Sequence, residues 1–239
     1  MNKIIAATAF LGCLLIACGP SDVGRTGRQK VKVIEHELTS AADFMPLQKG
    51  NSWTYAMDQI VRDTKGRQSS GTAELTFKVD KVVDQGEGKR ALFKVYNKSA
   101  ENSTVSFLCN SKGVYQTSLA GKDLTAPYDP PLPLIVWPSK PGQERKWAGR
   151  GYIAGLGAVG SLKSTITYKG VSDVDTPAGR MHAHRVDTVT SYTTGGKTYR
   201  STQSMWFVPT VGLVRSLDIT IGPAGVRQSD MRLKTSTRK

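Results

Sequence analysis

The side chains best suited to metal or acid–base chemistry are His182 and His184, two positions apart in a segment that reads as a strand. Residues at this spacing share one face of a β-strand, so both imidazoles could reach one metal ion. A zinc site needs at least a third protein ligand, and the only other histidine is His36, near the N-terminus. Arg180 and Arg185 would also oppose a cation. We therefore interpret the pair as facing solvent, with a weak metal or anion site as the alternative, and predict no bound metal.

Gly155, Gly157 and Gly160 have the Gly-x-Gly-x-x-Gly spacing of dinucleotide-binding loops, and Asp173 or Asp175 follows at a suitable distance. Such a loop needs a helix directly after the third glycine, because the helix N-terminus binds the pyrophosphate. The residues that follow are rich in β-branched side chains and predict a strand instead. We therefore predict no cofactor and interpret the glycines as a flexible loop or bend.

Cys109 is the remaining candidate nucleophile, and it follows Val105 and Phe107 at a spacing of two. This spacing places it on the apolar face of a strand, which favours a buried, unreactive thiol over a nucleophile. The sequence also lacks the Gly-x-Ser-x-Gly, His-Glu-x-x-His and EF-hand patterns. We predict no catalytic residues and a protein that is not an enzyme, although dispersed carboxylates leave an enzyme acting on envelope polymers as the last alternative.

A short cationic start precedes an apolar run over residues 4–17 that ends at Cys18. The run is too short to span a bilayer and has the length of a signal-peptide core. Its last residues, Leu15-Ile16-Ala17-Cys18, resemble the lipobox of bacterial lipoproteins. The resemblance implies that residues 1–17 are removed and that Cys18 receives diacylglycerol, usually with a further chain such as palmitate on the new N-terminus. An ordinary secretory signal, an uncleaved anchor and lipidation at Cys13 are the alternatives.

The residue after Cys18 is Gly19 rather than aspartate, which resembles the signal for outer-membrane sorting in enterobacteria. We therefore predict a protein anchored by its lipid in the bacterial cell envelope, in the outer membrane and facing the periplasm. Residues 18–42 are polar and basic with one short apolar patch, and they predict a flexible tether between the lipid and the folded domain.

The chain carries 33 Lys and Arg residues against 19 Asp and Glu, a formal net charge of +14. The cations are spread along the chain, apart from clusters at 25–32 and 232–239. A positive surface favours anionic partners, and outside the cytoplasm these would be lipid headgroups or other anionic envelope molecules. Because the cations are scattered, we interpret them as a solvated basic surface, and we predict contact with the membrane through the lipid on Cys18 and no nucleic-acid partner.

From residue 43 to 239 the hydrophobic pattern has a period of two, as in Ala73, Leu75, Phe77 and Val79. Turn signals separate about ten predicted strands, which lie near 51–62, 72–83, 90–97, 103–109, 113–118, 162–174, 180–194, 197–208, 211–221 and 226–234. No segment after residue 42 has a convincing helical period. The pattern predicts a single all-β domain with a strongly curved antiparallel sheet, as a meander, half-barrel or open barrel.

The stretch at about 119–161 interrupts this pattern with six prolines between 127 and 141. Proline lacks the backbone donor that a strand ladder needs, so we predict a long extended or polyproline-like loop. The loop also contains Trp137, Trp147 and several aliphatic residues. These indicate that it either packs across an open face of the sheet or forms a lid over a cavity.

Three short motifs resemble a broad group of uncharacterised bacterial secreted proteins and lipoproteins with a curved antiparallel sheet. They begin at Phe44-Met45-Pro46-Leu47, at Thr176-Pro177-Ala178-Gly179 and at Trp206-Phe207-Val208-Pro209. Thr210 follows the last proline, where that group commonly has glycine. The resemblance covers about 44–218 and implies fold and location but no catalytic residues. The curved sheet is also similar in architecture to the half-barrel of periplasmic lipoprotein carriers.

Taken together, these features predict a non-enzymatic envelope lipoprotein that binds a lipid-like or other amphipathic or anionic ligand. A structural or assembly lipoprotein that binds an envelope protein is the alternative. If the sheet encloses a cavity, the four tryptophans are its predicted aromatic lining: Trp53, Trp137, Trp147 and Trp206.

Overall fold

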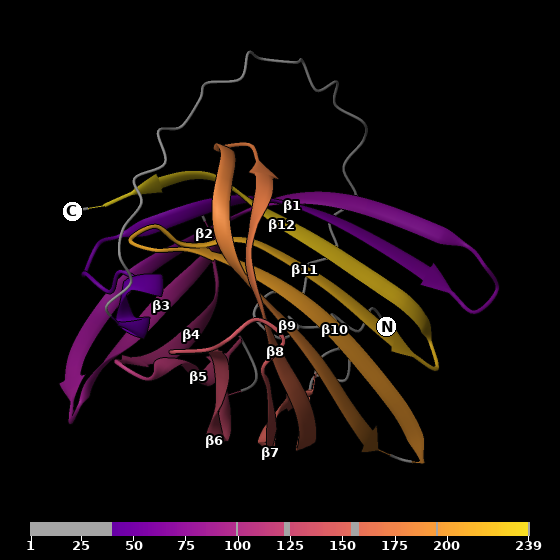
Figure 1. Ribbon diagram of the computed structural model, residues 1–239. Coiled ribbons are helices and arrows are strands. Elements are labelled where there is room, and N and C mark those ends of the chain that lie inside the picture. The colour runs from indigo at the N-terminus through magenta and orange to yellow at the C-terminus, as the bar shows by residue number, and fades with distance from the viewer. Residues whose placement is uncertain (1–39, 99, 122–124, 154–157, 195, 239) are drawn as a thin grey trace.

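The computed structural model describes residues 40–98, 100–121, 125–153, 158–194 and 196–238. Twelve antiparallel strands form one sheet, preceded by the short 3-10 helix η1 (Ala41–Phe44) (Figure 1). The strands are β1 (Ser52–Asp63), β2 (Gln68–Gln85), β3 (Gly88–Asn97), β4 (Ala100–Asn110), β5 (Gly113–Ala120), β6 (Thr125–Val136), β7 (Glu144–Ile153), β8 (Ala158–Thr176), β9 (Gly179–Thr194), β10 (Lys197–Val208), β11 (Gly212–Gly222) and β12 (Gly225–Thr237). Among the described residues, no helix is long and apolar enough to cross a membrane.

Each strand pairs with its neighbours in sequence, and β1 pairs with β12, so the sheet closes into a barrel. The predicted antiparallel meander is confirmed, and all ten predicted strands are present. The barrel differs from the prediction in its closure and in its two additional strands. Both of these, β6 and β7, lie in the stretch predicted to be a long loop at 119–161. The loop prediction was wrong there because polyproline-like backbone angles are close to those of a strand.

The prolines instead leave a weak seam between β6 and β7. Four of them, Pro127, Pro130, Pro131 and Pro133, lie within β6. Because proline has no N–H to donate, β6 cannot form a full ladder on both edges. It pairs with β5 over most of its length, but Asp129 opposite Arg150 is the single described register pair with β7. We call this join the β6–β7 seam.

The seam is held instead by close packing of β6 onto glycines of β7. A Cβ on Gly151 would lie 2.3 Å from a ring carbon of Tyr128, and a Cβ on Gly149 would lie 2.6 Å from the Asp129 carbonyl oxygen. Only glycine therefore allows β6 to approach β7 this closely.

The tip of the β8–β9 hairpin leaves the barrel wall and lies over β11 and β12 (Figure 1). The bend lies at a register shift next to Gly170, whose φ of +86° favours glycine. The Ala178 N–H then donates a hydrogen bond of 3.0 Å to the Leu233 carbonyl. Val174 and Ala183 are buried beneath the hairpin tip, so the tip belongs to the packed structure.

Candidate functional site

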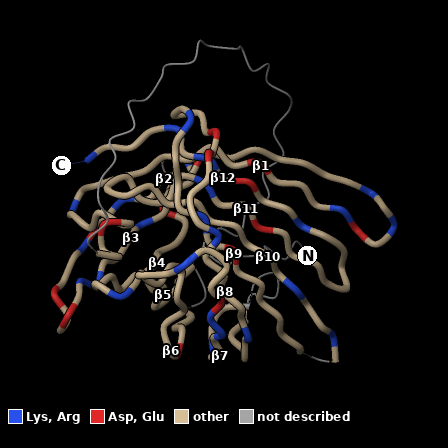
Figure 2. The backbone as a smooth tube through the Cα atoms, viewed as in Figure 1, with Lys and Arg blue, Asp and Glu red and all other residues tan. Residues whose placement is uncertain are grey.

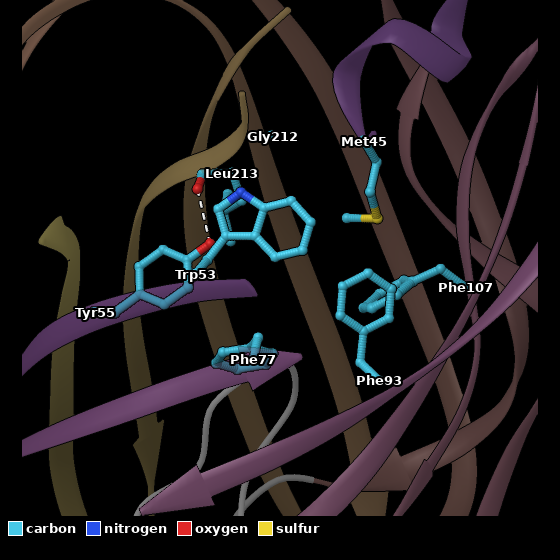
Figure 3. A pocket seen from close by; sticks show the side chains of 8 residues that line it. All are labelled: Met45, Trp53, Tyr55, Phe77, Phe93, Phe107, Gly212 and Leu213. Carbon is cyan, nitrogen blue, oxygen red and sulfur yellow. Dashed lines mark hydrogen bonds between the residues drawn. The ribbon is translucent and has the colours of Figure 1, made fainter. Parts of the chain in front are cut away.

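Inside one half of the barrel lies a small aromatic cavity (Figure 3). Its lining residues come from the start of β1, from β2 to β4, from β11 and from the segment after η1: Met45, Trp53, Tyr55, Phe77, Phe93, Phe107, Gly212 and Leu213. The polar atoms of its two amphipathic rings are satisfied. Trp53 Nε1–H donates to the Val211 carbonyl at 2.6 Å, and the Tyr55 hydroxyl donates to the Leu213 carbonyl at 2.8 Å. The walls therefore offer apolar surface to any occupant.

The aromatic cavity is narrow in this state. The centres of water molecules can occupy only about 20 Å³ of it, which corresponds to one or two waters. The rings around it fill the space by mutual contact, with centroids 5.8 Å apart for Trp53 and Phe93 and 5.1 Å apart for Phe93 and Phe107. An acyl chain therefore needs side chains at the mouth to move.

Helix η1 closes the end of the barrel next to this cavity. Ser40 caps it through a capping box, and Phe44 is fully buried. The Phe44 ring meets His184 at 4.8 Å, Trp137 at 5.5 Å and Phe207 at 6.4 Å between centroids. The predicted tether at 18–42 therefore ends earlier than expected, because residues 41 and 42 already belong to the docked helix.

Backbone hydrogen bonds fix η1 on two sides of the barrel mouth. The Thr210 N–H donates to the Asp43 carbonyl at 2.7 Å, and the Ala41 N–H donates to the Ser111 carbonyl at 3.3 Å. Thr210 has a φ of +63°, in the left-handed region that glycine adopts more easily. Thr210 therefore adopts a backbone conformation for which glycine, the residue common at this position in the resembling group, is better suited.

The two histidines predicted to form a solvent-facing pair have different surroundings. His182 is exposed and pairs with Asp173, which also accepts two hydrogen bonds from Arg180. His184 lies in the aromatic cluster around Phe44, where burial lowers the pKa of its imidazole. Its Nδ1 is 2.7 Å from the Tyr168 hydroxyl. The prediction was wrong for His184 because Phe44 of η1, Trp137 and Tyr168 pack on its ring, contacts that come from distant parts of the chain.

The other half of the barrel contains a second cavity, which we call the polar cavity because hydroxyl, amide and carboxyl groups are part of its otherwise largely apolar lining. It is lined by residues of β6 to β11: Tyr128, Leu132, Pro133, Leu134, Tyr152, Leu162, Ser164, Thr188, Thr190, Tyr192, Ser201, Gln203 and Asp218. Asp218 is buried, and its two carboxyl oxygens accept hydrogen bonds from Ser201 at 2.8 Å and Thr220 at 3.0 Å. Burial raises the pKa of this carboxyl, against the opposing effect of the two hydroxyl donors and Arg227.

The four tryptophans do not share one lining. Trp53 lines the aromatic cavity, and Trp137 packs on Phe44 at the barrel mouth. Trp147 is buried on β7, and its Nε1–H has no hydrogen-bond partner in the described part of the chain. Trp206 lies between the guanidinium groups of Arg185 and Arg215, 5.1 and 5.2 Å from its ring centroid. Ligand binding by these residues stays a prediction, and Trp53 is the one with direct access to a described cavity.

Cys109 is buried on β4, and burial raises the pKa of its thiol to about 12. A thiol with so high a pKa has almost no thiolate at neutral pH, so its environment fits an inert core residue. Two further sequence features lie wholly or partly outside the described residues. Cys18 and its lipobox lie wholly outside them. Of the Gly-x-Gly-x-x-Gly motif, Gly155 and Gly157 lie outside them, whereas Gly160 belongs to β8 and is followed by further strand residues.

The lining of the polar cavity was missed by sequence reasoning. Ser201, Gln203, Ser216 and Asp218 project into the barrel from β10 and β11, yet their outward neighbours include polar residues as well. A period-two pattern identifies the inner face only where that face is apolar. The buried hydroxyl groups of β8 to β11 lie side by side across the strands. They can be recognised as one group only when the register of these strands is known.

No protein-family model and no curated protein sequence matches this chain. Among solved structures, it is similar to an inferred exported protein with a YmcC-like fold from Bacteroides fragilis, with a TM-score of 0.50 and 15% identity over 80% of this chain and 97% of that one. It also matches an inferred lipoprotein from Parabacteroides distasonis, with a TM-score of 0.48 and 17% identity over 81% and 98% of the two chains. The hypothetical lipoprotein YmcC from Escherichia coli matches with a TM-score of 0.35 and 12% identity over 77% and 85%. The Bacteroides structure shows the fold of this chain, and the curved-sheet fold implied by its three motifs is confirmed.

Proposed function

We propose that this protein is a lipid-anchored envelope protein, attached through Cys18, whose barrel binds a lipid-like amphipathic ligand without catalysing a reaction. The lipobox supports the anchor, and the structurally similar protein from Bacteroides fragilis is described as exported, which agrees with a place outside the cytoplasm. We place the protein in the outer membrane, facing the periplasm, on the basis of Gly19.

One observation carries the binding function: the interior of the barrel holds two largely apolar cavities, and one of them also has a cluster of side-chain hydrogen-bonding groups. Aromatic rings from β1 to β4 line one cavity, while hydroxyl, amide and carboxyl groups from β8 to β11 line the other. The apolar part of an amphipathic ligand fits the aromatic cavity, and the polar cavity offers apolar surface together with hydrogen-bonding groups. Met45 lies in the wall of the narrow aromatic cavity next to η1, so its side chain would have to move to admit an acyl chain.

The first experiment tests the anchor. Cells that express the full chain are labelled with radioactive palmitate, and the protein is compared with its Cys18→Ser variant. We expect label and membrane association for the natural chain and neither for the variant. Label that persists in the Cys18→Ser protein would contradict lipidation at this residue.

The second experiment tests the cavity with dansyl-undecanoic acid as the probe and with the mature Cys18→Ser chain. Leu213→Phe adds a ring to the aromatic cavity, whereas Leu217→Phe makes the same change on β11 outside the cavity lining. We expect saturable binding that Leu213→Phe weakens and Leu217→Phe preserves, with circular dichroism showing that both variants are folded. Equal binding by both variants, or no binding, would count against a lipid-like ligand.

A protein partner is the second candidate, because a group of aliphatic side chains is exposed on the outer face. Ile221 and Val226 are paired across β11 and β12 and are 50% and 38% exposed, and Ile60 on β1 is 36% exposed. Such groups are common at protein interfaces when they form a continuous patch. Crosslinking in cells that depends on Ile221 would favour this function over ligand binding.

A further inference from the structure

The polar cavity has an unpaired hydroxyl that points to a ligand. Thr188 is 6% exposed and lines the cavity, and its Oγ1 has no hydrogen-bond partner in the described part of the protein. A buried hydroxyl without a partner costs free energy, so it is uncommon in a finished core. The nearby Ser164 and Thr190 hydroxyls, in contrast, pair with each other at 2.8 Å. Thr188 thus offers a donor and an acceptor to an occupant of the cavity.

The charges of the lining select against ionic occupants. Among the described residues that line the cavity there is no Lys, Arg or His, and Asp218 is the sole carboxylic acid. Arg227 lies outside the lining but acts on this carboxyl, so the two charges already balance each other in part, and an ionic occupant would disturb that balance. A metal ion would find one carboxylate, and the described residues contain no group of three or more His, Cys, Asp or Glu side chains suited to a metal. Neutral groups that exchange hydrogen bonds with hydroxyls fit best.

The size of the cavity limits the occupant further. Water centres can occupy about 40 Å³, which corresponds to roughly three or four water molecules. A neutral group with two or three adjacent hydroxyls, the size of glycerol, replaces that number of waters oxygen for oxygen. Its carbon atoms would lie against the aliphatic part of the lining, Leu132, Leu134 and Leu162.

An entrance is available at the β6–β7 seam. The cavity wall includes Leu132, Pro133 and Leu134 of β6, beyond the single register pair with β7 at Asp129. Parting the two strands there breaks few backbone hydrogen bonds, because the prolines of β6 form none as donors. Among the described strand pairs this join has the shortest ladder, so we expect local opening to begin there.

We propose that the polar cavity is a binding site for a neutral, glycerol-sized polyol group, which enters through the β6–β7 seam and bonds to Thr188, Asp218 and the neighbouring hydroxyls. The site is separate from the aromatic cavity and does not require an acyl chain. The group is therefore either a free polyol or the glycerol end of an uncharged lipid.

Saturation-transfer NMR with the mature Cys18→Ser chain tests this site, with glycerol, 1-monooctanoylglycerol and ethanolamine as separate probes. Thr188→Val removes the hydroxyl at nearly constant volume. Because that hydroxyl is unpaired, the variant should fold as well as the natural chain. Thr202→Val is the control, since it makes the same change on the outer face of β10.

We expect saturable transfer to the glyceryl protons that Thr188→Val weakens about 3- to 10-fold and Thr202→Val leaves unchanged. Binding of glycerol itself would identify a free-polyol site, whereas binding of monooctanoylglycerol alone would identify a lipid headgroup site. The proposal is overturned by three outcomes: no saturable transfer from either glyceryl probe, equal binding by both variants, or tighter binding of ethanolamine. Loss of glyceryl binding in Thr188→Val with dansyl-undecanoic acid binding intact separates this site from the aromatic cavity.

Discussion

Replacing Phe44 by alanine tests whether η1 is an integral part of the barrel. Its ring is fully buried and has three aromatic neighbours at the barrel mouth. Removing a buried phenylalanine ring costs about 3–5 kcal/mol in free energy of unfolding. For a domain of this size each kcal/mol lowers the melting temperature by about 2–4 °C, so we expect a fall of about 6–20 °C.

The assay is urea and thermal unfolding of the mature Cys18→Ser chain, followed by tryptophan fluorescence. Val171→Ala is the control, because Val171 is 57% exposed and its truncation should change the free energy of unfolding by less than about 0.5 kcal/mol. A chain that begins at residue 46 lacks η1 altogether. Its loss in free energy of unfolding is the upper limit for the loss expected from Phe44→Ala, because one side chain of η1 cannot contribute more than the docking of the whole segment. A loss below about 1 kcal/mol for Phe44→Ala would refute the view that this ring anchors η1 in the barrel.

Four further predictions concern single side chains. Because burial lowers the pKa of His184, stability should be lost as pH falls through about 6.5, and in urea titrations His184→Gln should flatten this dependence while His182→Gln should not. Because burial raises the pKa of Asp218 above about 3.9, stability should fall as pH rises through the raised value, and Asp218→Asn should remove this fall; an unchanged pH profile would sink the idea. The buried thiol of Cys109 should not react with Ellman's reagent until urea unfolds the mature Cys18→Ser chain, and rapid labelling of the native protein would contradict its burial. Thr210→Gly should raise the free energy of unfolding by up to about 1 kcal/mol, because it relieves a left-handed threonine, and a measured loss would show that the threonine side chain outweighs this strain.

The weak point of sequence reasoning was the proline-rich stretch. A proline cannot donate a backbone hydrogen bond to a neighbouring strand. It can still belong to an extended strand that needs few donors. Pro127 and Pro133 of β6 lie opposite Ser118 and Tyr115 of β5, so both prolines are accommodated within a paired strand. Whether an extended segment becomes a strand depends on the partner that it finds, which the local sequence does not contain.

The candidate site was the less predictable part of the molecule. Trp53, Tyr55 and Met57 are all buried on one face of β1, and that shared face follows from their spacing of two, which is a local property. The positions of Trp137 and Trp206 depend on η1 and on the β8–β9 hairpin, which pack on them from distant parts of the chain. Figure 2 shows a similar limit for charge, since the basic residues are spread over many strands and no single face could be assigned from their order in sequence.

The sequence by itself determined the strand pattern, the antiparallel meander and the lipid-attachment motif at Cys18, because each follows from residue types at short spacing. The tertiary structure decided the closure of the barrel, the docking of Phe44 in its mouth and the position of Thr188 and Asp218 around one cavity. These features depend on strand register and on contacts between residues far apart in the chain. Side-chain alternation tells which residues share a face, but only the closed sheet determines which face is inside and which polar groups meet there.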